Sequence, residues 1–137
     1  MVLIAFIFDS FILYNFNYWP IIPTAISQTL VIVGAVISIF HYNILKRFNK
    51  NISKPNYLVL KKGLFPYIRH PMYFGDMISC LGLFTLSANW ATVVVLLISY
   101  VALFKQAQIE DGYLEELFGE SFTNWSHQSK LIFPFVK

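Results

Sequence analysis

The chain has 137 residues, of which 57% are hydrophobic, 18% aromatic and only 12% charged, with a formal net charge of +3. Soluble domains carry about 25% charged residues, and a small domain has a large surface to cover, so this composition excludes a soluble globule. It also excludes intrinsic disorder, a soluble nucleic-acid-binding domain and a disulfide-stapled secreted domain, because Cys80 is the single cysteine of an apolar chain. The composition therefore predicts a small integral membrane protein with no nucleic-acid partner.

The longest charge-free stretch lies near the N-terminus. Residues 10–45 carry no formal charge, and their length is nearly twice the ~20 residues that one membrane crossing needs. Pro20 and Pro23 interrupt the stretch, and proline breaks helices. We expect two membrane-spanning helices here, over about residues 2–19 and 24–43.

A second charge-free stretch of 28 residues, 77–104, fits either one long tilted helix or a hairpin. Seven of the ten Lys and Arg residues lie in the segment 44–70, which contains no acidic residue. A hairpin puts all ten on one side of the membrane, as the positive-inside rule favours, whereas a single helix would divide them. We therefore expect spans over about residues 71–87 and 90–107, with 44–70 as a basic cytoplasmic loop.

The cytoplasmic tail, residues 108–137, begins with an amphipathic pattern. Ile109, Tyr113 and Leu117 recur at helical spacing, and acidic residues occupy much of the remainder. Gly119 is a common type of helix terminator. We expect an amphipathic helix over 108–120 that either lies on the cytoplasmic face or continues the fourth span.

These segments together predict an all-α, polytopic integral membrane fold. It has about four transmembrane helices and a C-terminal cytoplasmic amphipathic helix, in a single domain over residues 1–137. Both termini are expected in the cytoplasm, in a bacterial inner membrane or the endoplasmic reticulum. The lipid bilayer is thus an expected partner, and a homodimer is plausible because four spans offer little shielding for a site.

The run Gly63–Asp76 gathers polar and aromatic residues at the start of the third span. Pro71 suits the first position of a helix, because its missing N–H would have no partner there. The other early N–H groups of the helix then remain as donors, and this end favours negative charge. Arg69, His70 and Tyr73 stand beside it. They either anchor the helix at headgroup level or form one side of a binding site.

Two adjacent carboxylates, Glu110 and Asp111, follow the fourth span. They are suited to bind a cation or the hydroxyls of a ribose, or they form the solvated face of the amphipathic helix. A hairpin returns them to the membrane side that holds His70. Two polar clusters that converge at one membrane surface favour a site over isolated anchors.

The remaining polar residues give weaker signals. Asp9 is ionisable within a span, which indicates either function or a position near the helix end. His41 and His127 are expected to form local hydrogen bonds. No zinc or iron–sulfur ligand spacing is present, so no metal is expected. The six glycines never form Gly-x-Gly, which excludes the standard dinucleotide fingerprint and the P-loop.

Taken together, the two clusters resemble the isoprenylcysteine carboxyl methyltransferase family and the related membrane phospholipid methyltransferases. The likeness covers about residues 55–135. The residues that carry it are Gly63, Phe65, Arg69, His70, Pro71, Tyr73, Gly75, Glu110, Asp111, Leu114, Phe118, Gly119, Phe122, Trp125, Leu131, Ile132 and Pro134. The resemblance implies a methyltransferase that binds S-adenosylmethionine without a Rossmann domain, in a cytosolic pocket capped by the final helix.

The resemblance also implies the roles of individual residues. The contacts to S-adenosylmethionine would come from Tyr57, Leu58, Val59, Leu60, Phe65, His70, Pro71, Met72, Tyr73 and Glu110. Gln106 and Arg69 are expected near the substrate. Isoprenylcysteine enzymes carry arginine at the position of Gln106, and glutamine lacks the charge that binds a carboxylate. His70 is the candidate base if the substrate is an amine.

The expected function is therefore an S-adenosylmethionine-dependent methyltransferase that acts on a lipophilic, prenylated or lipid-like substrate at the cytoplasmic membrane face. Two alternatives remain open. The run Arg69-His70-Pro71-x-Tyr73-x-Gly75-Asp76, with Trp125, also resembles the C-terminal cofactor region of NADPH-dependent membrane sterol or enone reductases. A non-catalytic membrane protein would use both clusters as interfacial anchors.

Overall fold

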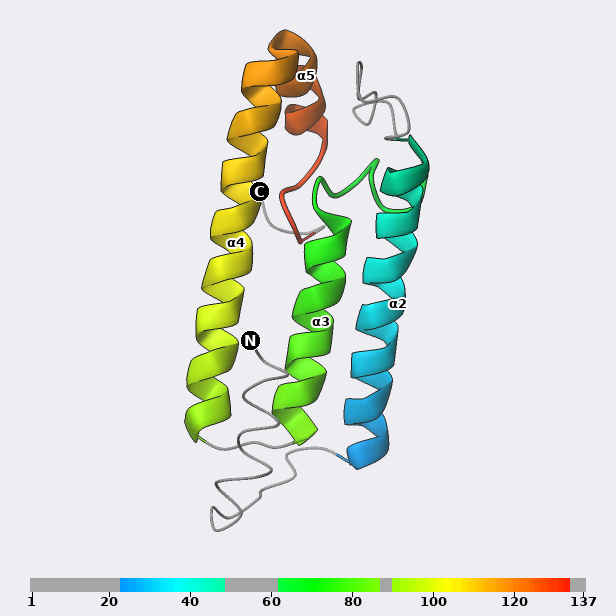
Figure 1. Ribbon diagram of the computed structural model, residues 1–137, viewed down its shortest axis with the longest axis vertical. Coiled ribbons are helices and arrows are strands. Elements are labelled where there is room, and N and C mark those ends of the chain that lie inside the picture. Colours follow the sequence, from blue (N-terminus) through cyan, green and yellow to red (C-terminus); the bar gives the residue numbers. More distant parts are fainter. Residues whose placement is uncertain (1–22, 49–61, 87–89, 134–137) are drawn as a thin grey trace.

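The computed structural model describes residues 23–48, 62–86 and 90–133. Four helices lie in these ranges, namely α2 (Thr24–Phe48), α3 (Pro71–Leu86), α4 (Trp90–Phe118) and α5 (Glu120–Gln128) (Figure 1). The same ranges contain no strand, only an isolated parallel β-bridge between Ile68 and Lys130. The all-helical prediction is confirmed for the described ranges, and the expected span over 2–19 lies outside them.

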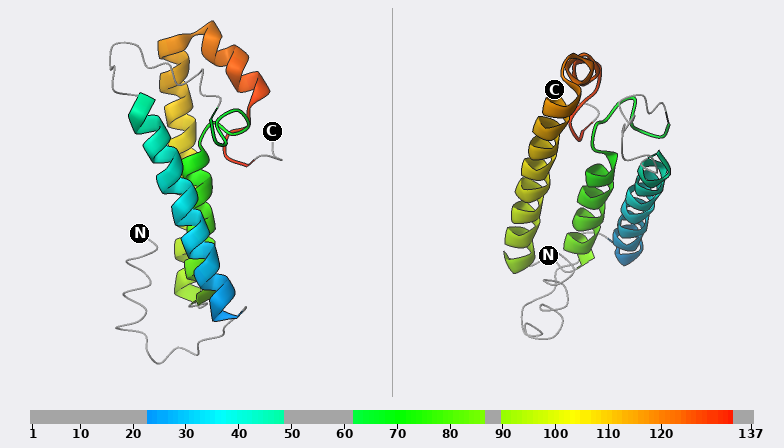
Figure 2. Two further views of the ribbon diagram at one scale, coloured as in Figure 1. Left: turned by 90° about the vertical axis from the view of Figure 1, so that its right-hand side faces the viewer. Right: turned by 45° about the horizontal axis from the view of Figure 1, so that its top comes forward.

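Helices α2, α3 and α4 run alternately up and down, with α3 between the other two (Figures 1 and 2). The antiparallel course of α3 and α4 fits the predicted hairpin over residues 71–107, whose crossing of the membrane stays a prediction. One end of this layer holds the end of α2, the start of α3 and the end of α4, and it is called the polar end below. Since α5 also lies there, the two polar segments of the sequence meet at one end of the molecule (Figure 2).

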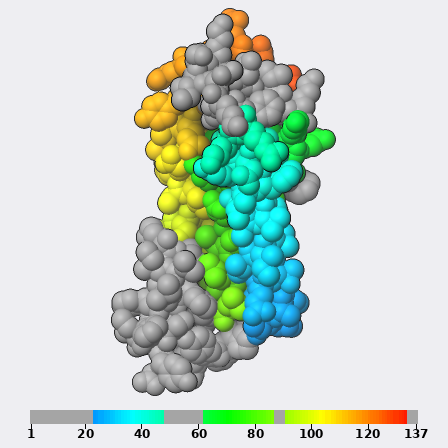
Figure 3. Space-filling view, turned by 45° about the vertical axis from the view of Figure 1, so that its right-hand side comes forward, coloured from blue at the N-terminus to red at the C-terminus, as the bar shows by residue number. Residues whose placement is uncertain are grey.

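Close approach of two backbones joins α2 to α3, and the space-filling view shows these helices side by side (Figure 3). A Cβ atom on Gly75 would lie 2.6 Å from the carbonyl oxygen of Gly34 and 2.7 Å from the backbone nitrogen of Ser38. Two side-chain hydrogen bonds accompany the crossing. Ser38 Oγ donates to Asp76 Oδ1 at 2.7 Å, and Ser79 Oγ donates to a carbonyl of α2 at 3.2 Å. Small residues thus let polar groups of both helices satisfy one another at membrane depth.

The predicted helix boundaries need two corrections. α2 was expected to end near residue 43 but continues to Phe48, with Lys46 and Arg47 in its last turn, where cations are favourable. The tail was not expected to contain a second helix, yet Glu120–Gln128 forms α5. The start of α3 at Pro71 and its end at Leu86 agree with the prediction.

α4 is one helix of 29 residues and includes most of the expected amphipathic segment, 108–120. Of the two alternatives for this segment, the structure therefore shows the one in which it continues the preceding helix. At about 1.5 Å per residue α4 is ~43 Å long, which exceeds the ~30 Å hydrocarbon core. Its charge-free residues end at Phe104, so the acidic last turns lie beyond the charge-free part of the helix. The helix ends at Phe118 because Gly119 adopts a positive φ of 52°.

Among the described residues, two helices are long and apolar enough to cross a membrane, over Thr24–Arg47 and Ala91–Phe118. α3, with 16 residues, is shorter. Large apolar side chains project from the two long helices without protein cover, among them Ile32, Val36, Leu97 and Val101 at about 60% exposure. Such a surface suits contact with lipid.

The buried core lies toward the polar end, where the chain returns from α5. Met77, Ala107 and Ile132 form one apolar cluster contributed by α3, α4 and the segment after α5. Ile68 and Ile132 are each 1% exposed. The C-terminal segment is therefore held against the start of α3, and this packing fixes the surroundings of the polar cluster.

Candidate functional site

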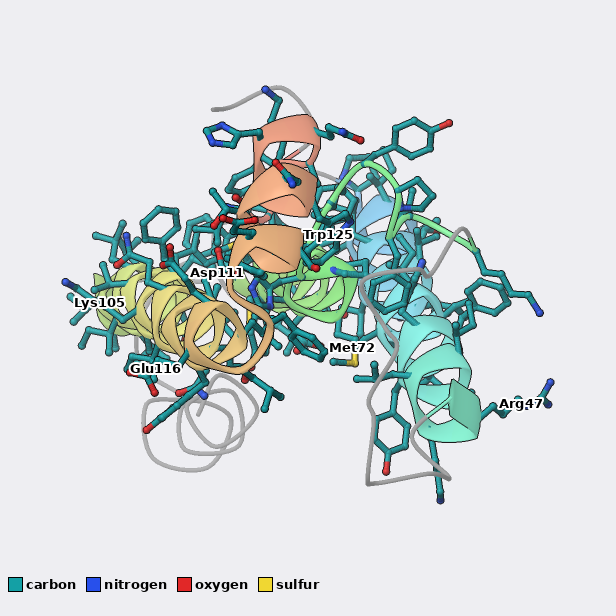
Figure 4. The ribbon with its side chains drawn as sticks, turned by 90° about the horizontal axis from the view of Figure 1, so that it is seen from above. Arg47, Met72, Lys105, Asp111, Glu116 and Trp125 are labelled. Atoms are coloured by element: carbon teal, nitrogen blue, oxygen red, sulfur yellow. The ribbon has the colours of Figure 1, made fainter. Side chains whose placement is uncertain are left out.

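Side chains from α4 meet the start of α3 at the polar end. His70 Nε2 lies 2.8 Å from Asp111 Oδ1, and His70 Nδ1 lies 3.4 Å from Glu110 Oε2. The hydroxyl of Tyr73 donates a hydrogen bond to Glu110. In the view from above, Asp111 faces the centre of the molecule, whereas Lys105 and Glu116 project outward from α4 (Figure 4). The two clusters expected from the sequence thus form one cluster.

His70 is buried between two carboxylates. Burial by itself lowers the pKa of its imidazole, but the hydrogen bonds and charges of Asp111 and Glu110 outweigh this effect and raise the pKa above its ordinary value. Its ring also stacks on Tyr73, with centroids 5.5 Å apart and planes 14° from parallel. Because both nitrogens face carboxylate oxygens, His70 in this arrangement donates from both and has no lone pair to accept a substrate proton.

Glu110 is the more exposed acid of the cluster, with 37% of its side chain accessible. Hydrogen bonding to His70 lowers the pKa of this carboxyl to about 2, assisted by Tyr73 and Gln106 and opposed by partial burial. Gln106 Nε2 donates to Glu110 Oε1 at 3.1 Å. Glu110 is therefore an ionised acceptor, and its exposed part is available to a ligand.

Arg69 ties the C-terminal segment to the cluster. Its Nε donates to Asp111 Oδ2 at 2.9 Å, and its Nη1 donates to the carbonyls of Ser126 and Ser129, each at 2.9 Å. These carbonyls lie at the end of α5, where the unpaired acceptors of a helix attract a cation. The Arg69 side chain thus donates hydrogen bonds to α4 and to the end of α5 at the same time.

Backbone hydrogen bonds hold the segment before α3 in place. The N–H groups of Arg69 and His70 donate to the carbonyls of Lys130 at 2.7 Å and Leu131 at 3.0 Å. The N–H of Lys130 donates to the carbonyl of Tyr67 at 2.9 Å. Arg69 and His70 are therefore fixed in backbone position before their side chains reach α4.

A cavity of about 200 Å³ opens beside this cluster. Its walls come from the end of α2, the start of α3, the end of α4 and α5. They consist of Leu45, Phe65, Arg69, His70, Pro71, Met72, Tyr73, Glu110, Tyr113, Leu114 and Trp125. The walls are mainly apolar and aromatic with a few converging polar groups, which is the usual composition of a small-molecule site.

Most of the residues expected at the site line this cavity. Phe65, Arg69, His70, Pro71, Met72, Tyr73 and Glu110 are all in its walls. Gln106 reaches the site through Glu110 instead. Tyr57, Leu58, Val59 and Leu60 lie outside the described residues, as do Asp9 and the other residues of the first expected span.

The structure adds contacts that the sequence did not assign. Asp111 was expected beside Glu110 in the acidic pair, but not as the residue that contacts both Arg69 and His70. Tyr113 and Leu114 belong to the amphipathic pattern and the family resemblance but were not assigned to the cavity, although helical spacing from Glu110 puts them on the same face. Leu45 gave no such signal, because its place depends on how α2 packs.

Two other polar residues singled out in the sequence, His41 and His127, are not among the residues that line the cavity. His41 Nδ1 lies 2.7 Å from its own helix at the Ile37 carbonyl, which confirms the local hydrogen bond expected for it. Within the described part of the chain, no group of three His, Cys, Asp or Glu residues is arranged to hold a metal ion.

Comparison with known proteins agrees with this arrangement. Over 108 residues, 78% of the chain, the sequence is 32% identical to 3-oxo-5-alpha-steroid 4-dehydrogenase 1 of Mus musculus, and the match spans 40% of that longer protein. No solved structure matches the chain significantly. The profile of the phospholipid methyltransferase family matches residues 22–121, which include α2, α3, α4 and the whole cluster. The chain belongs to the phospholipid methyltransferase family.

Proposed function

We propose that the protein is an integral membrane methyltransferase that uses S-adenosylmethionine and acts on a lipophilic acceptor at the cytoplasmic membrane face. The observation that carries the proposal is the cavity at the polar end, where the partly exposed carboxylate of Glu110 adjoins the aromatic rings of Tyr73 and Trp125. Family membership supports methyl transfer as the reaction class.

The residues present fit this cofactor. Phe65, Tyr73 and Trp125 offer aromatic faces to a sulfonium cation, an attraction of about 0.5–2 kcal/mol. Glu110 is suited to accept hydrogen bonds from an ammonium group or a ribose. The first N–H groups of a helix have no partner within the helix, so the start of α3 suits the carboxylate of the cofactor. When bound, S-adenosylmethionine supplies an activated methyl group for an in-line displacement by the acceptor.

The charges at the cavity favour this cofactor over a dinucleotide phosphate. Among the described residues of the cavity wall, Arg69 has its Nε and Nη1 engaged by Asp111 and the end of α5. Protonated His70 lies between Glu110 and Asp111. Of these described charges, the carboxylate of Glu110 is the one that is exposed to a ligand, and it attracts a cation and repels phosphate.

In this proposal, the residues of the protein position the cofactor and the acceptor and exclude water from the cavity. His70 is a positioning residue in this proposal, since its proton holds Glu110 and Asp111 together. Gln106 stands where related carboxyl methyltransferases have arginine, so this position offers no guanidinium to an acceptor carboxylate. The apolar flanks of α2 and α4 suit an acceptor that reaches the cavity from the bilayer. Methyl transfer depends mainly on such alignment.

Ligand-dependent thermal stability of the detergent-solubilised protein tests the proposal. S-adenosylhomocysteine should raise the melting temperature and NADPH should not. Glu110→Gln should weaken S-adenosylhomocysteine binding about tenfold or more, because it removes the accepting charge. Glu116→Gln, on the outward side of α4 (Figure 4), should bind like the wild type. Equal binding by both variants would reject the assignment of Glu110.

A second candidate is an NADPH-dependent reductase of a lipophilic enone. The 32% identity to 3-oxo-5-alpha-steroid 4-dehydrogenase 1 favours it, together with Asp76 and Trp125 in the sequence run shared with membrane reductases. Stabilisation by NADPH but not by S-adenosylhomocysteine would support this candidate and exclude the first.

A further inference from the structure

A second cavity lies at the polar end, beside the last two turns of α2. It measures about 420 Å³ and is lined by Phe40, Ile44, Arg47, Lys62 and Gly63. None of these residues lines the cavity beside Glu110. Arg47 projects away from the cluster around Asp111, on the far side of α2 (Figure 4). The second cavity is therefore separate from the candidate active site.

A buried histidine supports the turn at Gly63, which lines this cavity. His41 is 3% exposed, and its Nε2 accepts a hydrogen bond from the N–H of Leu64 at 3.0 Å. Gly63 lies against the same imidazole with a φ of 60°, and a Cβ atom there would come within 2.6 Å of His41 Nε2. Only glycine adopts this conformation at this distance without strain. The turn that carries Lys62 is thus fixed against α2, next to Arg47.

The cavity is apolar toward the bilayer and basic toward the cytoplasm. Phe40, Ile44 and Arg47 follow one another at i, i+4 and i+7, so they share one face of α2. At about 1.5 Å per residue, Phe40 lies ~10 Å deeper along the helix than Arg47. The side chain of Phe40 is 54% exposed. An acyl chain fits along Phe40 and Ile44 while its headgroup stays level with the two cations.

The neighbouring cation, Lys46, belongs to a different face of α2. Its Nζ lies 5.9 Å from the ring centroid of Tyr42. Consecutive residues of a helix project about 100° apart. Lys46 and Arg47 therefore share the same membrane depth and charge, but Arg47 alone of the two lines the cavity.

We propose that this cavity binds one anionic phospholipid, whose phosphate pairs with Arg47 and Lys62 and whose acyl chain lies along Phe40 and Ile44. Guanidinium and ammonium groups are the usual partners of phosphate, and basic pockets beside cytoplasmic helix ends hold acidic headgroups. The bound lipid stabilises the turn at Gly63, and that turn carries Phe65 into the other cavity. This site does not depend on which reaction the protein catalyses.

Native mass spectrometry of the detergent-solubilised protein, equilibrated with equal amounts of phosphatidylglycerol and phosphatidylcholine, tests the proposal. The wild type should retain one phosphatidylglycerol in preference to phosphatidylcholine. The double variant Arg47→Gln, Lys62→Gln should lose about tenfold or more of this preference. Lys46→Gln should keep it. Melting temperatures measured without lipid confirm that each variant is folded.

Three outcomes would overturn the proposal. The first is that the wild type shows no preference between the two lipids. The second is that Lys46→Gln loses as much of the preference as the double variant, which would indicate general attraction of a basic surface. The third is that inorganic phosphate displaces the phosphatidylglycerol completely, which would indicate a site for free phosphate without a contribution from the acyl chain.

Discussion

At the residue scale, the proton of His70 joins α3 to α4. The carboxylates of Glu110 and Asp111 raise the pKa of His70, and the stabilisation they provide is complete below its ordinary value of 6.5. It is lost as the pH rises through the raised value, because the neutral ring cannot donate to both acids. The pKa of Glu110 is lowered from 4.5 to about 2, so its contribution is present above 4.5 and is lost as the pH falls toward 2.

We therefore expect the detergent-solubilised protein to be most stable between about pH 4.5 and pH 6.5. Its melting temperature should fall on the alkaline side of this window. His70→Gln should be less stable within the window and should lack the alkaline decrease. Thermal unfolding followed by tryptophan fluorescence across the pH range measures both. An unchanged alkaline decrease in the variant would assign it to another group.

Arg69 provides a second prediction, because one guanidinium serves two helices. Arg69→Lys keeps the charge but cannot reach Asp111 and the carbonyls of Ser126 and Ser129 together. Loss of a hydrogen bond to a charged group costs about 1.5–3 kcal/mol. We expect faster amide hydrogen exchange over residues 120–133, measured by mass spectrometry, and little change within α2.

The matched control for this variant is Lys105→Gln. Lys105 is an exposed cation that projects outward from α4 (Figure 4). Its loss should leave exchange over residues 120–133 as in the wild type. If both variants raise the exchange equally, the attachment of α5 does not depend on Arg69.

The sequence could predict that Glu110 and His70 lie at one end of the molecule, because the positions of the charge-free segments indicate how the helices alternate. It could not predict which of the two acids contacts which basic side chain. Two adjacent acids on a helix project about 100° apart, so the phase of α4 decides which acid contacts Arg69. That phase depends on packing at Met77 and Ala107, which lie in the buried core.

At the scale of elements, the contact between α2 and α3 depends on glycine. A Cβ atom on Gly75 would lie 2.6 Å from a carbonyl oxygen of α2. Gly75→Ala should therefore lower the free energy of unfolding by about 1–3 kcal/mol, as overpacking does. The lipid-independent melting temperature of the purified protein measures this effect.

The same substitution on α4 is the control. A Cβ atom on Gly112 would meet nothing within 4 Å. Alanine is favoured over glycine in a helix by up to ~1 kcal/mol, so Gly112→Ala should leave the protein as stable as the wild type or more stable. Equal losses from both substitutions would show that the α2–α3 crossing is not the cause.

The course of α4 shows why helix boundaries were harder to predict than spans. Lys105 marks where the apolar segment ends, but no proline or glycine interrupts the chain until Gly112. Residues such as Gln106, Glu115 and Glu116 favour a helix, so the helix continues past the membrane segment. The terminator at Gly119 was predicted correctly, because its positive φ is a local requirement. Helix α5 was not predicted, since its position depends on contacts with Arg69.

At the scale of the whole molecule, the alternating course of α2, α3 and α4 brings the end of α2 and the end of α4 together and leaves the start of α2 at the opposite end (Figure 1). We therefore expect Lys46 and Glu116 on one side of the membrane and Thr24 on the other. In a Cys80→Ala background, a membrane-impermeant maleimide should label Lys46→Cys and Glu116→Cys from the same side. Thr24→Cys should react only from the opposite side. Labelling of all three from one side would contradict a membrane-spanning arrangement.

The attachment of Lys130 and Leu131 to the segment before α3 has a consequence for biosynthesis. A chain emerges from the ribosome in order from its N-terminus, so α2, α3 and most of α4 can enter the bilayer before residues 130 and 131 have been made. Until then, the N–H groups of Arg69 and His70 lack the carbonyls that hold them. Insertion of these helices and completion of the site are thus separate events in time, since the site can be completed only after residues 130 and 131 have been made.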